Sequence, residues 1–221
     1  MSQLLSQTAR IAIVDDHAIV RYGYTQLINH QDNLVVCGVA ANEQEGIELV
    51  KRERPDLTIV DLSLSEGHGI DLIKSILADN PKAKVLVVSA HDENLFAHRV
   101  LTAGSMGYVN KQEATNDLVE AIHSILNGEL YFSPSVTQSF MRGRMGGNST
   151  LNPDEVQSLT DRELQVFEQI GGGKTTRDIA NSLFLSVKTV ERYKENIKRK
   201  LAIENATQLV QRATQWCMTR D

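Results

Sequence analysis

The sequence predicts an α/β fold, in which a doubly wound (βα)5 parallel sheet is followed by a small all-α domain of four helices. Three observations support it. Short apolar runs alternate with helically spaced segments over the first 130 residues, a stretch rich in small and polar residues interrupts this pattern, and amphipathic segments with capping residues follow. The chain of 221 residues is 41% hydrophobic and 23% charged, which leaves room for two small domains. We expect a first domain over 1–130, a linker over 131–154 and a second domain over 155–221.

Five apolar runs rich in β-branched residues predict the strands of the sheet. Each run is too short for a helix and is apolar on both faces, as buried parallel strands are. The runs lie at 11–14, 34–36, 57–60, 85–88 and 108–109. Apolar residues with helical spacing lie between them and after the last, for example at 47–50, 70–77 and 118–126. Right-handed crossovers then place any site at the carboxyl ends of the strands.

The pattern stops over 133–153, where prolines, glycines, serines and threonines mark the linker. Capping residues then predict the starts of three helices, at Thr160 with Glu163, at Thr175 with Asp178, and at Ser186. A fourth helix follows through 209–216. The apolar residues expected to face the core from the third helix are Val187, Val190, Ile197 and Leu201.

Several classes of protein are excluded by composition. The longest run without a charged, amide or hydroxyl residue is 34–41, which is far short of a membrane span. The first ten residues lack the pattern of a signal peptide, so a cytoplasmic location is expected. Cys37 and Cys217 stand far apart with no C-x-x-C pair, and neither a disulfide framework nor a metal knuckle is indicated.

Charge is distributed unevenly along the chain. The net charge of −5 divides into −6 for residues 1–150 and +1 for residues 151–221. Within the second part, 188–200 contains six basic and two acidic residues. This density favours a polyanionic partner, although charge alone is equally satisfied by a solvated helix face with i,i+4 ion pairs.

Polar residues follow or end four of the five predicted strands. They are Asp15, Asp16, Asp61, Ser89 and Lys111. Carboxylates brought together at one edge of a sheet repel one another unless a cation is present, and Mg²⁺ is the natural occupant. Asp61 as nucleophile, Lys111 as counter-charge and the Ser89 hydroxyl as donor would suit a phosphorylated aspartate. The alternative is that each residue is an ordinary polar strand end.

The first domain closely resembles the receiver of a bacterial two-component response regulator of the NarL/FixJ class. The resemblance covers about residues 9 to 128. It is carried by Val14-Asp15-Asp16-His17, Val60-Asp61-Leu62, Val88-Ser89-Ala90 and Gly107-Tyr108-Val109-Asn110-Lys111. It implies a doubly wound (βα)5 parallel-sheet receiver domain followed by an all-α four-helix helix-turn-helix domain.

The resemblance also implies roles for individual residues. Asp61 would be the phosphoacceptor, and Mg²⁺ would be held by Asp16, Asp61 and the Ser63 backbone carbonyl, with Asp15 acting through water. Ser89 and Tyr108 match the switch positions: the phosphoryl charge would draw Ser89 inward and open a space into which Tyr108 turns. Ser63 and His91 match positions where relatives tune dephosphorylation, although an exposed His91 without a role is also compatible with the sequence.

The second domain resembles the LuxR-type helix-turn-helix over about residues 156 to 216. The motifs are Leu159-Thr160-Asp161-Arg162-Glu163, Asp178-Ile179-Ala180, Ser186-Val187-Lys188-Thr189-Val190 and Ile197-Lys198-Arg199-Lys200-Leu201. By alignment, the base-reading positions fall on Glu191, Arg192 and Glu195, while Lys188, Thr189 and Lys198 would hold phosphates. Arg199 completes the outward, DNA-binding face of the helix over 187–201.

The function implied is a phosphorylation-dependent DNA-binding transcriptional regulator of a two-component system. It would be no enzyme beyond its own phosphoryl transfer and dephosphorylation. The partners implied are a sensor histidine kinase, double-stranded promoter DNA, RNA polymerase and a second copy of the chain when phosphorylated, with no membrane involved. Two alternatives stay open: a phosphorylation-dependent protein-binding adaptor, and a Mg²⁺-dependent aspartyl-phosphate phosphatase, for which Ser63 stands where an acid or base is needed.

Overall fold

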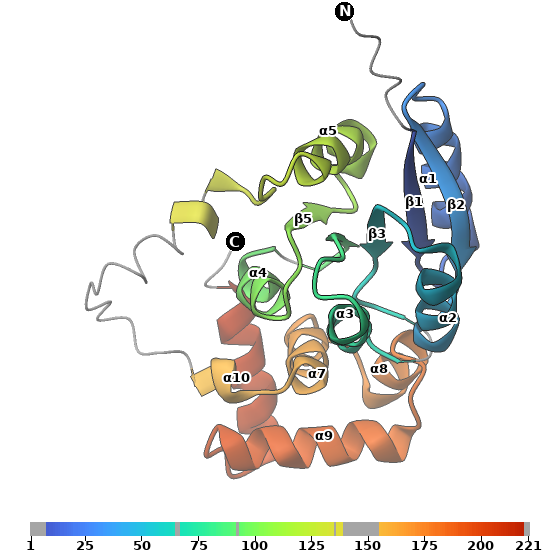
Figure 1. Ribbon diagram of the computed structural model, residues 1–221. Coiled ribbons are helices and arrows are strands. Elements are labelled where there is room, and N and C mark those ends of the chain that lie inside the picture. The colour runs from blue at the N-terminus through green and yellow to red at the C-terminus, as the bar shows by residue number, and fades with distance from the viewer. Residues whose placement is uncertain (1–7, 65–66, 92, 135, 139–154, 219–221) are drawn as a thin grey trace, which may run out of the picture. The chain divides into compact units, whose positions relative to one another are not determined.

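The computed structural model describes residues 8–64, 67–91, 93–134, 136–138 and 155–218 (Figure 1). The chain divides into two compact units, Met1–Gly147 and Asn148–Asp221, and each is considered by itself. Most of the linker expected over 131–154 lies outside the described residues. Among the described residues, no helix combines the length and the apolar character that crossing a bilayer would require.

The first unit is built on a parallel sheet of five strands, and the predicted doubly wound fold is confirmed (Figure 1). The strand order is β2-β1-β3-β4-β5. The strands are β1 (Ala9–Val14), β2 (Leu34–Ala40), β3 (Leu57–Val60), β4 (Val85–Ser89) and β5 (Gly107–Asn110). Four of them extend beyond the predicted runs, because the apolar core of each strand continues into polar or small residues at its ends.

Five helices connect and cover these strands. They are α1 (Ala18–Asn29), α2 (Glu43–Glu53), α3 (Gly69–Asp79), α4 (Glu93–Thr102) and α5 (Ala114–Leu126). Helices α1 and α5 share one buried cluster with alternate residues of the sheet, including Ile11, Ile13, Ile59 and Val88. Helix α2 contacts α3 and β1. Gly46 of α2 approaches Val14 and Leu72 so closely that an added Cβ would crowd both.

The strand register explains why polar side chains gather at one edge of the sheet. Val14 pairs with Val60, so the next residues in the two strands, Asp15 and Asp61, emerge side by side. Ser89 pairs with Asn110, and the Lys111 amide then donates to the Ser89 carbonyl over 2.8 Å. A glycine at position 69 lets α3 begin against the backbone of Asp61, where a Cβ would overlap the Asp61 carbonyl oxygen.

The second unit is helical throughout its described secondary structure. A 3-10 turn (Glu155–Ser158) precedes α7 (Asp161–Gly171), α8 (Thr176–Ser182), α9 (Val187–Lys200) and α10 (Ala206–Met218). Both predicted capping boxes are present, at Thr160 with Glu163 and at Thr175 with Asp178. Helix α7 packs on α10 and α9, and α8 packs on α9. The rings of Phe167 and Trp216 lie 5.4 Å apart in the core.

One core prediction for α9 is wrong. Val190 and Ile197 are fully buried and Leu201 is 6% exposed, but Val187 is 46% exposed. At about 100° per residue, Val187 lies about 60° round the helix from Val190 and about 80° from Ile197. It is also the first residue of the helix. Val187 therefore sits at the border of the buried stripe rather than within it.

Candidate functional site

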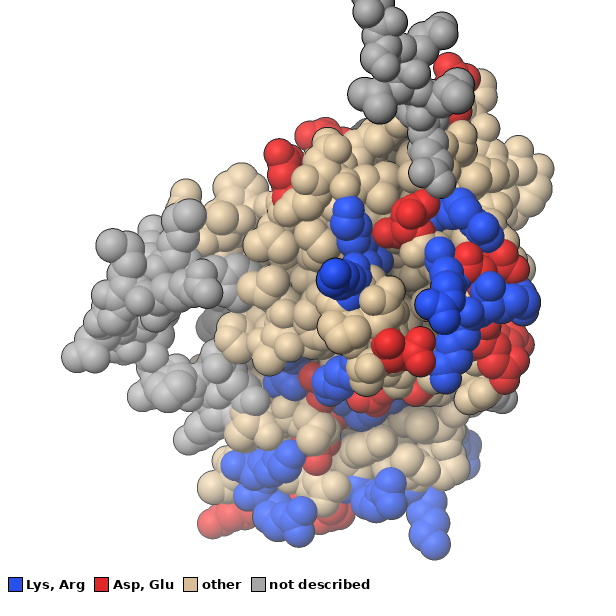
Figure 2. All heavy atoms as spheres, viewed as in Figure 1, with Lys and Arg blue, Asp and Glu red and all other residues tan. Residues whose placement is uncertain are grey.

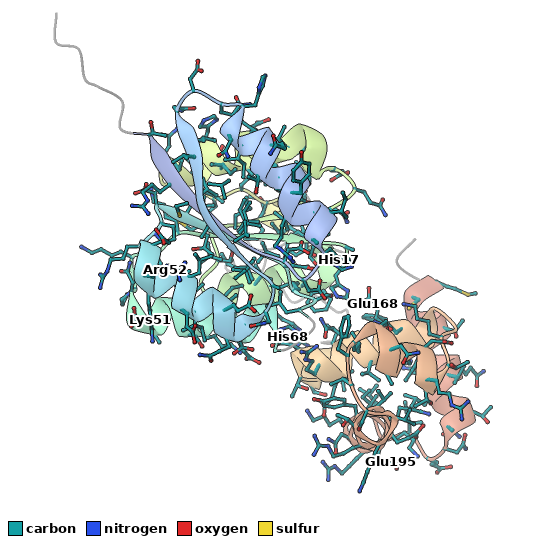
Figure 3. The ribbon with its side chains drawn as sticks, turned by 90° about the vertical axis from the view of Figure 1, so that its right-hand side faces the viewer. His17, Lys51, Arg52, His68, Glu168 and Glu195 are labelled. Carbon is teal, nitrogen blue, oxygen red and sulfur yellow. The ribbon has the colours of Figure 1, made fainter. Side chains whose placement is uncertain are left out.

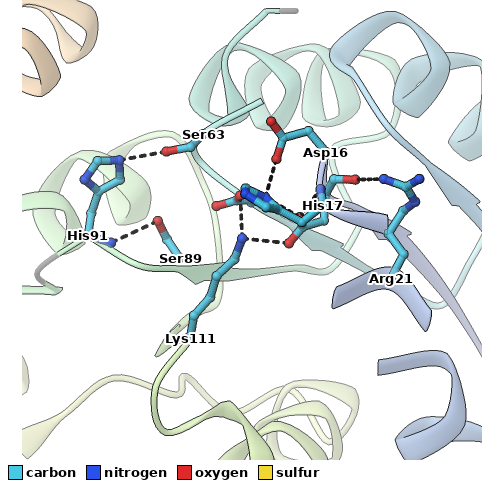
Figure 4. Close-up of polar contacts among 9 residues, drawn as sticks. Asp16, His17, Arg21, Ser63, Ser89, His91 and Lys111 are labelled. Atoms are coloured by element: carbon cyan, nitrogen blue, oxygen red, sulfur yellow. Dashed lines mark hydrogen bonds and ion pairs between the residues drawn. The ribbon is translucent and has the colours of Figure 1, made fainter. Parts of the chain in front are cut away.

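Three carboxylates, Asp15, Asp16 and Asp61, meet at the carboxyl edge of the sheet and are called the carboxylate cluster here. Asp15 and Asp61 are each 2% exposed. The Lys111 ammonium bridges these two, with its Nζ 2.6 Å from Asp61 Oδ2 and 2.8 Å from Asp15 Oδ2 (Figure 4). The structure thus brings together the carboxylates and the lysine that the sequence placed at separate strand ends.

Burial dominates the electrostatics of this cluster. Desolvation raises the pKa of Asp61 from 3.8 to about 6, against the opposing charge of Lys111. Burial would lower the pKa of Lys111, but the charges of Asp61 and Asp15 outweigh it and raise that pKa above its ordinary value. Near neutral pH the cluster therefore holds an ionised Asp61 whose charge is only partly compensated, and Lys111 stays cationic.

The cluster has the donors that a divalent cation needs. Asp61 Oδ1 is buried and has no hydrogen-bond partner of ordinary geometry among the described residues. The Ser63 backbone amide lies close enough to lower the pKa of that carboxyl. One donor atom each from Asp15, Asp16, His17 and Asp61 lie within 4.8 Å of one another. Oxygen donors at this spacing, including a buried oxygen left unsatisfied, fit a hard cation such as Mg²⁺.

Two residues at the cluster were not identified from the sequence. The His17 Nδ1 atom lies 2.6 Å from Asp16 Oδ1 and 3.3 Å from Asp15 Oδ1. Arg21 donates from a guanidinium nitrogen to the Asp15 carbonyl oxygen over 2.6 Å (Figure 4). The position of His17 directly after the two aspartates was a signal that could have found it. Arg21 carried no signal, because only the start of α1 at Ala18 turns it back toward Asp15.

A second group of contacts centres on His91, next to the end of β4. The His91 ring Nε2 is 2.9 Å from the Ser63 hydroxyl, and the His91 amide donates to Ser89 Oγ over 3.3 Å (Figure 4). The Tyr108 hydroxyl donates to the His91 carbonyl over 2.7 Å. The ring of Phe96 in α4 lies 4.8 Å from that of His91. His91 is therefore partly buried and bonded, rather than exposed and without contacts.

Tyr108 and Ser89 are both interior residues. Ser89 is fully buried and Tyr108 is 2% exposed. The turn of Tyr108 into a space opened by Ser89 after phosphorylation stays a prediction. Ser63, Ser89 and Tyr108 are thus joined through one residue, His91.

The predicted DNA-binding side chains occupy the outer side of α9. Lys188, Glu191, Arg192, Glu195 and Arg199 are exposed, while Thr189 and Lys198 are half-buried. Figure 2 shows both basic and acidic side chains over α9 at the bottom of the view. In Figure 3, α9 is seen nearly end-on, with Glu195 labelled beside it.

Several of these side chains have partners within the domain. Glu191 Oε1 accepts from Thr176 Oγ1 and from Lys194 Nζ, each over 2.9 Å. The hydrogen bond from Lys194 holds the pKa of Glu191 below its ordinary value. Glu191 therefore ties α9 to the first residue of α8, a contact that the sequence analysis did not foresee.

Other contacts run along the helix itself. Glu195 pairs with Lys198 over 2.8 Å, and Arg199 donates to Asn196 over 3.1 Å. The Arg192 guanidinium lies 5.8 Å from the centre of the Tyr193 ring. Arg192, Glu195 and Arg199 are exposed despite these contacts, whereas the Lys198 side chain is only 18% exposed.

Fold and site together define a two-domain signalling protein, with an acidic sheet edge in one unit and a helix-turn-helix in the other. Residues 11–123 match the family model for the response regulator receiver domain, and residues 157–213 match the model for bacterial regulatory proteins of the luxR family. The chain belongs to the response regulators that carry a LuxR-type C-terminal domain.

Individual relatives agree with this assignment. The oxygen regulatory protein NreC of Staphylococcus carnosus is 33% identical over 208 residues, which cover 92% of this chain and 96% of that protein. A LuxR-family two-component response regulator from Aurantimonas is 36% identical with a TM-score of 0.58, over 63% of this chain and 99% of that chain.

The similar solved structures include ones determined with DNA. RcsB from Salmonella enterica serovar Typhimurium, bound to promoter rprA in the presence of the phosphomimetic BeF3-, is 26% identical with a TM-score of 0.61. The match covers 94% of this chain and 99% of RcsB.

Proposed function

We propose that this response regulator is phosphorylated on Asp61 and that the phosphorylated form binds promoter DNA through α9. The carrying observation is the buried Asp61 carboxylate, 2.6 Å from the Lys111 ammonium and beside two further carboxylates. A buried nucleophile with an adjacent cation and a metal-binding donor set is suited to accept a phosphoryl group. A sensor histidine kinase is the proposed donor.

The residues of the site divide the chemistry between them. An ionised Asp61 oxygen attacks phosphorus, and the bond from phosphorus to the donor's leaving atom breaks as the new acyl phosphate forms. Lys111 balances the charge of the phosphoryl oxygens, and the Ser89 hydroxyl donates to one of them. Asp15, Asp16, Asp61 and the Ser63 carbonyl would hold Mg²⁺, which supplies the positive charge that phosphoryl transfer needs.

The assignment of Asp61 is tested with a small phosphodonor. The full-length chain is treated with acetyl phosphate and Mg²⁺, and the modified residue is identified by mass spectrometry. Asp61→Asn should abolish the modification. Asp16→Ala should also abolish it, because the site loses a ligand of the cation and with it the positive charge that the cation supplies. The matched control is Asp56→Asn, an exposed aspartate at the opposite end of β3. Undiminished phosphorylation of Asp61→Asn would contradict the assignment.

For DNA binding, we propose that Arg192 contacts a guanine and that Lys188, Thr189, Lys198 and Arg199 hold phosphates. The Glu191 contacts with Thr176 and Lys194 both use Oε1, so its Oε2 is the oxygen that can accept from cytosine N4. Glu195 is the second candidate for such a contact. The likeness to RcsB, whose structure contains promoter DNA, supports this orientation of α9.

The proposed DNA function is tested by selecting bound sequences from random DNA with the phosphorylated protein. Affinity for the selected site should fall steeply with salt concentration, because phosphate contacts release counterions. Selected sites should contain paired half-sites, and light scattering should show a dimer after phosphorylation. Salt-independent or undetectable binding would favour the protein-binding adaptor instead.

A further inference from the structure

His17 lies beside the carboxylate cluster and has no part in the proposed phosphoryl transfer. It follows Asp16 directly, at the start of α1, and its side chain is 60% exposed. Its Nδ1 atom nevertheless points at the cluster, with Asp16 Oδ1 at 2.6 Å and Asp15 Oδ1 at 3.3 Å (Figure 4). The other side of the ring is therefore open to solvent, while one nitrogen faces the carboxylates.

His17 Nδ1 and Asp16 Oδ1 lie at ion-pair distance, 2.6 Å apart. Asp16 Oδ1 is buried and has no hydrogen-bond partner of ordinary geometry, although the imidazole nitrogen is within 2.6 Å. Asp61 Oδ1 is likewise buried and unsatisfied. Two carboxylate oxygens without hydrogen-bond partners of ordinary geometry thus belong to residues whose candidate ligand atoms, His17 included, lie within 4.8 Å of one another.

The spacing of these atoms suits a single six-coordinate ion. Octahedral coordination at about 2.1 Å places neighbouring donors about 3 Å apart and opposite donors about 4.2 Å apart. The distances from His17 Nδ1 to the two aspartates are 2.6 and 3.3 Å, and all four candidate donors lie within 4.8 Å. Small side-chain movements would bring them to ligand distances, and the exposure of His17 lets such an ion enter and keep water ligands.

We propose that His17 is a protein ligand of the divalent cation through Nδ1. The carboxylate cluster is then a mixed nitrogen and oxygen site, and it prefers ions such as Co²⁺, Ni²⁺ or Zn²⁺ over Mg²⁺. Imidazole nitrogen binds these borderline ions far better than it binds Mg²⁺, which takes oxygen donors. The inference rests on the proposed cation site but adds a ligand and a metal preference to it.

Pulsed electron paramagnetic resonance of bound Mn²⁺ tests the ligation directly. Full-length protein with ¹⁵N-labelled histidine is loaded with Mn²⁺ alone at pH 7.5, and coupling of the manganese electron spin to imidazole nitrogen is recorded. We expect coupling in the unaltered chain and in His30→Gln, and its loss in His17→Gln. His30 is the matched control, because it is exposed and lies at the other end of α1.

Competition against bound Mn²⁺ tests the metal preference. The free Mn²⁺ signal is followed while Mg²⁺ or Co²⁺ is added, which gives the ratio of their dissociation constants. His17→Gln should lower the preference for Co²⁺ over Mg²⁺ by about tenfold, and His30→Gln should leave it unchanged.

Each other outcome is decisive. Bound Mn²⁺ without nitrogen coupling, coupling that persists in His17→Gln, or an unchanged metal preference in that variant would overturn the role of His17 and leave the cation site intact. If neither Mn²⁺ nor Mg²⁺ binds, both His17 ligation and the proposed cation site are wrong. The labelling measurement on the unaltered chain does not depend on how any variant folds.

Discussion

Replacing Asp61 with asparagine should stabilise the first unit at pH 7.5 in metal-free buffer. The pKa of Asp61 rises from 3.8 to about 6 because folding removes its carboxylate from water. At about 1.4 kcal/mol per pKa unit, ionised Asp61 costs the folded state about 3 kcal/mol. Asparagine removes that cost, but it also removes the ion pair between Lys111 and Asp61. Lys111 keeps its second ion pair, with Asp15 Oδ2 at 2.8 Å. We therefore expect a net gain of about 1 to 3 kcal/mol.

The sign of the effect depends on pH. The folded pKa of Asp61 lies above the unfolded value, so stability from this group is fully present below about pH 3.8 and is lost as pH rises through about 6. The gain from Asp61→Asn should therefore be largest near pH 7.5, and about half of it should disappear at pH 5. Added Mg²⁺ should stabilise the unaltered chain and have little effect on the variant.

The assay is urea unfolding of the full-length chain with two probes. The single tryptophan, Trp216, lies in α10 and reports on the second unit, while far-UV circular dichroism reports on both units. The unfolding transition that appears in circular dichroism but not in Trp216 fluorescence belongs to the first unit, and only this transition should shift to a different urea concentration. A gain from Asp61→Asn that is no larger at pH 7.5 than at pH 5, or a variant that is less stable than the unaltered chain at pH 7.5, would refute the argument from desolvation.

Three further predictions follow from named contacts. His91→Ala should shorten the lifetime of the phosphorylated chain about threefold, because water gains access near Ser63 when the ring is removed. The decay of the phosphoprotein after the phosphodonor is removed measures this lifetime. Lys200→Met should destabilise the second unit by about 3 kcal/mol in a Trp216-monitored urea titration, because the nearly buried Glu163 carboxylate loses its cationic partner. The control Lys188→Met should have no effect. Arg192→Ala should cost about 1 to 3 kcal/mol at one base pair, whereas Lys188→Ala should weaken binding to all sequences alike and lower the salt slope by about one. If Arg192→Ala loses the same affinity for the selected site and for every site with one base changed, Arg192 contacts a phosphate.

The alternation of apolar runs and helical spacing determined the architecture of the first unit. Strands buried on both faces must be apolar throughout, and parallel strands must be joined by helices, so local pattern carries the topology. The same rule placed Asp15, Asp61 and Lys111 at one edge before any contact was known. Capping boxes at Thr160 and Thr175 were readable because their chemistry lies within four consecutive residues.

Only the tertiary structure decided which atoms meet. Strand register brought Asp15 beside Asp61, and the turn into α1 aimed His17 and Arg21 back at the cluster. The contact between Ser63 and His91 joins residues 28 positions apart, and the one between Thr176 and Glu191 joins two helices. Such contacts depend on packing angles and rotamers that no local periodicity encodes. Val187 shows the same limit, since the packing of α9 decides that the border of its buried stripe leaves Val187 46% exposed.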